Sequence, residues 1–149
     1  MTNSINNSAE QNAPPAISDF DLAGISEELI KSAKLEVATQ PNASGEYGLK
    51  EEGVLFPYFT AYGDPVHDDG YDFARIRLLR SRGDQKYSQR RNTGAHSYLT
   101  LWILGHERNG CLYLIEGEKK ALALASEGLA AVGLPGFYGY RSNGFLTPD

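Results

Sequence analysis

Cysteine is scarce in this chain, because only Cys111 among the 149 residues is a cysteine. One thiol excludes an internal disulfide framework and a zinc site built from several cysteines. Cys111 comes just before an apolar segment, so we expect a buried structural thiol rather than a nucleophile. The low cysteine content also predicts a reducing, cytoplasmic setting.

Long apolar runs are absent as well. No run approaches the roughly 20 residues that a helix needs to cross a bilayer, and the N-terminus lacks the charged and then apolar order of a secretory signal. The sequence therefore predicts no membrane partner. Hydrophobic residues make up 41% of the chain and aromatic residues 11%, which suits one globular domain with a buried core.

Large apolar side chains are almost missing from residues 1–18, where Asn, Ser, Ala, Gln and Pro dominate. This composition predicts a disordered tail, followed by a single domain over residues 19–149. Helical spacing of apolar residues and the capping residue Ser26 predict a helix over residues 25–35. Strands are expected within residues 53–60, 73–79 and 86–89.

Two segments of the domain carry additional signals. Pro57 places the strand of residues 53–60 at a sheet edge or a bulge, because proline cannot donate to a ladder. The apolar segment of residues 97–104 fits a strand and a helix equally well.

The strand of residues 73–79 alternates between apolar and basic side chains. Ala74, Ile76 and Leu78 take one face, and Arg75 and Arg77 project side by side from the other, which we expect to be exposed.

The net charge of −5 conceals a segregation along the chain. Residues 1–72 carry 3 basic and 13 acidic residues, residues 73–91 carry 7 and 1, and residues 92–149 carry 4 and 5. Because the local field attracts a partner more than the total charge does, the basic segment is a candidate for binding a polyanion. A solvated basic hairpin is the alternative.

The most informative segment runs from Leu112 to Gly136 and reads as strand, helix and strand. An apolar run ends abruptly at Glu116 and Gly117, a helical pattern continues to about residue 127, and a second apolar run closes at Gly136. The pattern predicts a parallel pair of strands joined by a crossover helix. Ligands gather at the carboxyl ends of such strands, so Glu116 is a candidate site residue.

The first turn of this predicted helix contains Glu118, Lys119 and Lys120. A carboxylate suits the positive end of the helix dipole, whereas two lysines oppose it. The lysines are explained if an anion binds there, since helix N-termini attract phosphate. Ordinary exposed helix residues are the alternative.

These residues resemble the first half of a toprim domain, the magnesium-dependent catalytic fold of bacterial primases and topoisomerases. The run EGEKKA from Glu116 and the GLPG turn from Gly133 are similar to a toprim-like family of uncharacterised domains in phage, plasmid and integrative-element proteins, often attached to primase or helicase modules. Upstream, GVLFPYFTAYGDPV, FARIRLL and KYSQ are similar to the segment before the toprim domain of bacterial-type primases. The resemblance covers residues 22–141.

The resemblance implies a role for each matching residue. Glu116 matches the toprim glutamate, which acts as a general acid/base or as a metal ligand. Glu118 is a second, weaker carboxylate for Mg²⁺. Lys120 departs from bacterial primases, which usually have aspartate there, and agrees with the uncharacterised relatives. The basic side of the primase groove, which holds nucleic-acid or nucleotide phosphates, is matched by Arg75, Arg77 and Lys86.

A complete toprim domain also needs a later strand ending in Asp-x-Asp, and this chain has none. Asp68 and Asp69 come too early, and we interpret them as solvated turn residues. We therefore expect an α/β fold with an α+β N-terminal part and a toprim-like half-domain that is incomplete at its C-terminus. Mg²⁺-dependent nucleotidyl or phosphoryl transfer would require the missing segments, so the chain should be inactive alone.

Three hypotheses for the function follow. The first is a nucleic-acid-processing module of a mobile genetic element that binds DNA or nucleotides, with Tyr58, Tyr62 or Tyr87 available to stack bases. The second is a non-catalytic remnant or accessory domain that binds DNA or protein. The third is a structural domain whose charges only keep it soluble.

Overall fold

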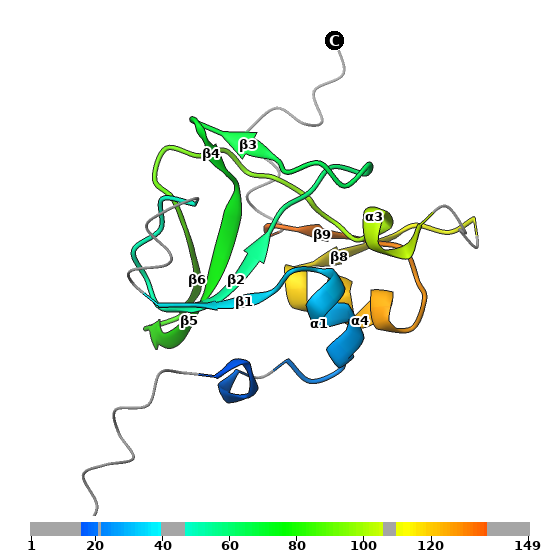
Figure 1. Ribbon diagram of the computed structural model, residues 1–149, viewed down its shortest axis with the longest axis horizontal. Coiled ribbons are helices and arrows are strands. Elements are labelled where there is room, and N and C mark those ends of the chain that lie inside the picture. The colour runs from blue at the N-terminus through cyan, green and yellow to red at the C-terminus, as the bar shows by residue number, and fades with distance from the viewer. Residues whose placement is uncertain (1–15, 21, 40–46, 106–109, 137–149) are drawn as a thin grey trace, which may run out of the picture.

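The computed structural model describes residues 16–20, 22–39, 47–105 and 110–136 (Figure 1). Helices and sheets are mixed, so the predicted combination of an α+β part and a strand-helix-strand unit is confirmed. The predicted tail lies outside the described residues except for its end, where Ile17–Asp19 forms one turn of 3-10 helix. None of the described helices is long and apolar enough to cross a membrane.

The first sheet is antiparallel and has the strand order β1-β2-β5-β6. Its strands are β1 (Glu36–Ala38), β2 (Gly53–Pro57), β5 (Ala74–Arg82) and β6 (Gln85–Gln89). The predicted alternation of β5 is confirmed, because Ala74, Ile76 and Leu78 are buried in a small apolar cluster on one face. Arg75 and Arg77, which alternate with these residues, project from the opposite face.

Pro57 does not mark an edge strand, so this expectation is wrong. β2 lies between β1 and β5, but β1 pairs with β2 only from Gly53 to Leu55. The amide of the next residue, Tyr58, donates to the carbonyl of Phe73 on the β5 side. Because amides alternate along a strand, the nitrogen of Pro57 faces the side where β1 has already ended, and no ladder hydrogen bond is lost.

The second sheet contains the strand-helix-strand unit and has the order β7-β9-β8. β8 (Tyr113–Glu116) runs parallel to β9 (Ala131–Leu134), and α4 (Glu118–Ser126) connects them, as the sequence predicts. Cys111 precedes β8 at the sheet edge and is exposed, so the prediction of a buried thiol is wrong. Residues within and before this edge strand are open to solvent, and Leu114 of β8 is 68% exposed.

The ambiguous segment of residues 97–104 contains both a strand and a helix. β7 (Tyr98–Leu99) pairs antiparallel with β9, and α3 (Leu101–Leu104) follows at once. Thr100 makes the transition, because its hydroxyl both accepts from the amide of Ala131 and donates to its carbonyl. The side chain thus replaces one step of the strand ladder while the backbone turns into the helix.

One apolar core joins the two sheets and the helices. Phe56 and Tyr58 from the first sheet pack in the same cluster as Leu122 from α4 and Leu29 from α1 (Glu27–Ser32). α1 contacts α4 and lies next to it in Figure 1. Ser26 accepts from the amide of Leu29 at 3.2 Å, which confirms its predicted capping role. α4 is therefore held between its own sheet and the N-terminal part of the chain.

Candidate functional site

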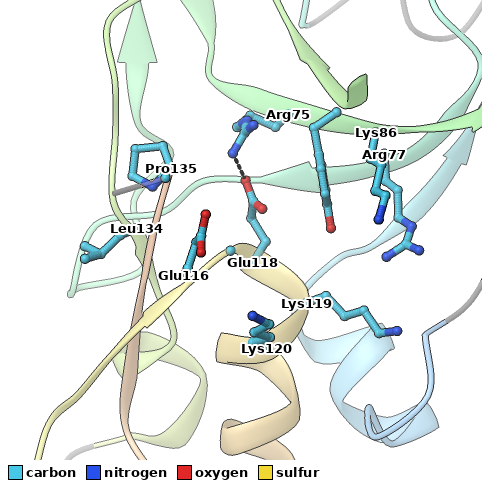
Figure 2. Close-up of a pocket in the computed structure, with 12 residues that line it drawn as sticks. Arg75, Arg77, Lys86, Glu116, Glu118, Lys119, Lys120, Leu134 and Pro135 are labelled. Carbon is cyan, nitrogen blue, oxygen red and sulfur yellow. Dashed lines mark hydrogen bonds and ion pairs between the residues drawn. The ribbon is translucent and has the colours of Figure 1, made fainter. Parts of the chain in front are cut away.

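A pocket of about 360 Å³ lies between the two sheets, where β5 and β6 face the junction of β8 and α4 (Figure 2). We call it the β5–α4 pocket. The structure brings every charged residue singled out as a site candidate into its wall. These are Arg75, Arg77, Lys86, Glu116, Glu118, Lys119 and Lys120. The end of β9 and the ring of Tyr87 complete the lining.

Gly117 forms the turn between β8 and α4 at the floor of this pocket. Its φ of 89° and ψ of 154° lie in a region that essentially only glycine adopts. Its amide donates to the carbonyl of Leu134 at 3.0 Å, and its carbonyl accepts from the amide of Ala121. The turn is therefore tied to β9 on one side and to the first turn of α4 on the other.

Gly133 explains why the EGE turn and the GLPG turn occur together. A Cβ added to Gly133 would lie 2.9 Å from the carbonyl oxygen of Gly117, which is closer than real Cβ atoms come to backbone. Only glycine in β9 lets the Gly117 turn pack this closely. Gly136, the last residue of the second motif, has a φ of 117° and borders Glu116. The two sequence motifs are thus one structural unit.

The N-terminus of α4 opens onto the pocket without a side-chain cap, because glycine occupies the cap position. Backbone amides of an uncapped first turn and the helix dipole favour an anion. Lys119 and Lys120 extend from this turn, and Figure 2 shows them below Glu118. Arg77 and Lys86 approach from the first sheet, so positive charge reaches the pocket from two sides.

Glu118 is the buried centre of the wall, with 1% of its surface exposed. Its Oε1 accepts from Nη1 of Arg75 at 2.7 Å and from the hydroxyl of Tyr58 at 2.6 Å. Removing charges from water costs on the order of several kcal/mol per ion, which a well-placed pair offsets. Within the described part of the chain, Glu118 Oε2 and Arg75 Nε are buried without a hydrogen-bond partner.

The buried carboxylate changes the pKa values of its neighbours. Burial, and then the negative charge of Glu118, raises the pKa of Tyr58 well above 10. The same two causes raise the pKa of Tyr98. Burial is the largest single effect on Arg75 and lowers its pKa, but the charge of Glu118 and the interactions with Tyr58 together outweigh burial, and the net shift is upward. Arg75 and Glu118 therefore face each other as a charged pair.

Arg75 is consequently not on an exposed face, and that expectation is wrong. The first turn of α4 covers the basic side of β5 at this position, and only 16% of the Arg75 side chain is exposed. Arg75 and Arg77 both lie near the ring of Tyr87, with guanidinium carbons 5.1 and 5.9 Å from its centre. Of the two arginines of β5 that line the pocket, Arg75 is neutralised by Glu118, and Arg77 lies at the pocket rim.

The three tyrosines considered for base stacking differ in their surroundings. Tyr58 is 1% exposed and belongs to the core, so it cannot stack on a base. Tyr62 is 89% exposed but lies outside the wall of the β5–α4 pocket. Tyr87 lines the pocket. Its position opposite Arg77 in the β5–β6 register could be found only after the strand pairing was known.

The interpretation of Asp68 and Asp69 as solvated turn residues is wrong for Asp68, which lies in a strand and is partly buried, whereas Asp69 does lie in a turn and is exposed. They close a hairpin between β3 (His67–Asp68) and β4 (Tyr71–Asp72), where Asp69 and the following glycine have positive φ. Oδ2 of Asp68 lies 2.6 Å from Nε2 of His96, and Oδ2 of Asp69 accepts a hydrogen bond from Nη1 of Arg90 at 2.7 Å. The hydrogen bond with His96, and then that with the amide of Gly94, lowers the pKa of Asp68. Arg90 is therefore also neutralised within the basic segment.

The described residues contain no group of three or more His, Cys, Asp and Glu side chains placed to hold a metal. Glu118 is committed to Arg75, which leaves Glu116 as the exposed carboxylate of the pocket. Mg²⁺ needs six oxygen ligands, of which one or two are usually carboxylates. Mg²⁺ remains a prediction of the family resemblance, and we derive no step through it.

Comparison with known proteins gives one partial match. Residues 101–145 match a domain of unknown function, DUF3854. The matched segment contains α3, the β8-α4-β9 unit and both glycine motifs, but less than a third of the chain. No curated protein and no solved structure matches the chain.

Proposed function

We propose that this protein is a nucleic-acid-processing module of the toprim-like, primase-associated type carried by mobile genetic elements. In this proposal the β5–α4 pocket binds the phosphates of DNA or of nucleotides. One observation carries it, namely that cationic side chains from the first sheet and from α4 converge on the uncapped N-terminus of α4. The segment that is similar to DUF3854, residues 101–145, contains both glycine motifs of the pocket.

The charge balance of the pocket supports an anion with more than one negative charge. Arg75 is balanced by Glu118 inside the wall. Four further cationic side chains line the pocket against one exposed carboxylate, that of Glu116. They are Arg77, Lys86, Lys119 and Lys120. Its volume of about 360 Å³ falls at the lower end of the range for small-molecule sites, which suits a mononucleotide or one nucleotide of a strand.

Salt-dependent DNA binding tests this proposal. A labelled single-stranded oligonucleotide is titrated by fluorescence anisotropy at NaCl concentrations between about 50 and 200 mM. Each neutralised phosphate contributes about −0.7 to the slope of log K against log salt for single strands, so the four cationic side chains predict about −3 when each neutralises a separate phosphate of the strand that passes through the pocket. Arg77→Ala and Lys120→Ala should each reduce the steepness by about 0.7.

The matched control is Lys31→Ala, which removes an exposed lysine from the last turn of α1, outside the pocket. It should leave the slope unchanged. Binding that ignores salt, or a Lys31→Ala effect as large as that of Lys120→Ala, would falsify a phosphate site at this position. Competition by mononucleotides, inorganic phosphate and duplex DNA then identifies the preferred ligand.

A non-catalytic accessory or remnant domain that binds DNA or protein is the alternative form of this proposal. Glu116 distinguishes the two, because its exposed carboxylate lies in the same pocket as the proposed phosphate. Primer synthesis or strand cleavage in Mg²⁺ that is lost in Glu116→Gln would favour the enzyme, with a primase or helicase module as its expected partner. Activity that survives this substitution would remove the role of Glu116.

A further inference from the structure

We infer that Glu118 is a positioning residue, which holds the N-terminus of α4 against β5 and thereby aligns the two walls of the pocket. The inference rests on the proposed function, because it explains how a phosphate site carries a buried carboxylate in its wall. Glu118 itself does not contact the phosphate in this account. It acts through the backbone amides and lysines of the helix that it begins.

One wall of the pocket is formed by the first sheet, and the other by the start of α4 beside the second sheet. The two walls are therefore not aligned by strand pairing. β5 and β6 belong to the first sheet, whereas α4 follows β8 of the second. The Glu118 side chain crosses between them to Arg75 on β5 and to Tyr58, which follows β2. These contacts join residues 43 and 60 positions apart at the helix end that faces the pocket.

The buried cluster of Glu118, Arg75 and Tyr58 contributes more to the geometry of the pocket than to the stability of the fold. A buried ion pair is often no more stabilising than apolar side chains of similar size. Here the cost is greater, because Glu118 Oε2 and Arg75 Nε have no partner in the described part of the chain. A polar cluster of this kind fixes one arrangement through its hydrogen-bond directions. Because Glu118 is the first residue of α4, the cluster fixes the direction in which the N-terminus of the helix points.

A positioning role and simple electrostatics predict opposite changes in DNA affinity when the Glu118 side chain is removed. A carboxylate repels a bound phosphate, so its removal should strengthen binding if charge alone matters. Glu118→Ala should instead weaken binding of the labelled oligonucleotide by roughly tenfold, the scale typical of losing a residue that orients the direct ligands of a site. Glu118→Gln is isosteric, and its amide oxygen can still accept from Arg75 and Tyr58, so it should bind as tightly as the native protein or more tightly.

Glu116 provides the matched control, because it is an exposed carboxylate in the same pocket. Glu116→Ala and Glu116→Gln should both tighten binding, by up to about fivefold, as expected for one exposed charge. A tightening in Glu118→Ala like that in Glu116→Ala would overturn the positioning role. Far-UV circular dichroism establishes that each variant is folded at the assay temperature.

A second measurement decides the inference without any ligand. The amides of Gly117 and Ala121 donate to the carbonyls of Leu134 and Gly117, so their hydrogen exchange should accelerate in Glu118→Ala and stay near the native rate in Glu118→Gln. Equal exchange in the native protein and in Glu118→Ala would refute the positioning role even if DNA binding were established. Absence of salt-dependent binding in the native protein would refute the proposed function, while the exchange comparison would still test the role of Glu118.

Discussion

Gly117 permits the most direct test of how the pocket floor is built. Its backbone angles, φ 89° and ψ 154°, belong to a region that costs about 1–3 kcal/mol for a residue with a side chain. Among the described residues, an added Cβ at Gly117 meets no heavy atom within 4 Å beyond its chain neighbours. The cost of Gly117→Ala should therefore come from backbone conformation alone and not from a clash.

We expect Gly117→Ala to lower the free energy of unfolding by about 2 kcal/mol, the middle of this range. For a chain of this size the same change lowers Tm by about 4–8 °C. Because the space around the Cβ is open, Gly117→Ser should cost about as much as Gly117→Ala. Urea denaturation followed by circular dichroism gives both values, with the m-value as a check that the unfolded state is unchanged.

Gly94→Ala is the control for this series. Gly94 does not have a positive φ, and an added Cβ would make only ordinary contacts at 3.7 Å or more. Its effect should remain within about 0.5 kcal/mol. The reasoning fails if Gly117→Ala is as mild as Gly94→Ala, or if Gly117→Ser is much more costly than Gly117→Ala.

Three further results are expected. The lowered pKa of Asp68 stabilises the native state above the ordinary carboxyl pKa of about 4, and this stabilisation is lost as pH falls through the lowered native pKa. Asp68→Asn should therefore be destabilising at pH 7 and progressively less so as the pH falls below about 4 in urea titrations. Tyr98 has a buried hydroxyl without a partner in the described structure, so Tyr98→Phe should raise the free energy of unfolding by about 1 kcal/mol at pH 7. Because the pKa of Tyr98 is raised in the native state, the same substitution should reduce the loss of stability above about pH 10. Mg²⁺ without nucleotide should leave Tm unchanged, because the described residues lack a metal-binding group, whereas a rise in Tm that disappears in Glu116→Gln would reveal a site.

Local patterns in the sequence were sufficient to predict the elements that build the pocket. The alternation along β5 places Arg75 and Arg77 on one face, and two apolar runs around a helical pattern give the β8-α4-β9 unit. These signals depend on periods of 2 and 3.6 residues, which are visible in a short window. Each candidate site residue was thereby assigned to its correct element, although a short window does not show that these elements meet.

The contacts between distant elements could not be predicted in this way. A glutamate in the first turn of a helix suits the dipole whether it is exposed or buried, so nothing local indicates that Glu118 is buried against Arg75. The charge of the basic segment misled for the same reason, since Arg75 and Arg90 are paired with acids far away in the chain. Likewise, Gly133 could be explained only after the Gly117 carbonyl was found beside it.

Backbone NMR locates the phosphate most directly. A mononucleotide is titrated into the ¹⁵N-labelled protein, and amide shifts are followed along the chain. The account predicts saturable shifts at residues 117–120, the beginning of α4, that weaken with added salt and in Lys120→Ala. Saturable shifts confined to the exposed end of the β5–β6 hairpin at residues 80–85, with none at the start of α4, would contradict it.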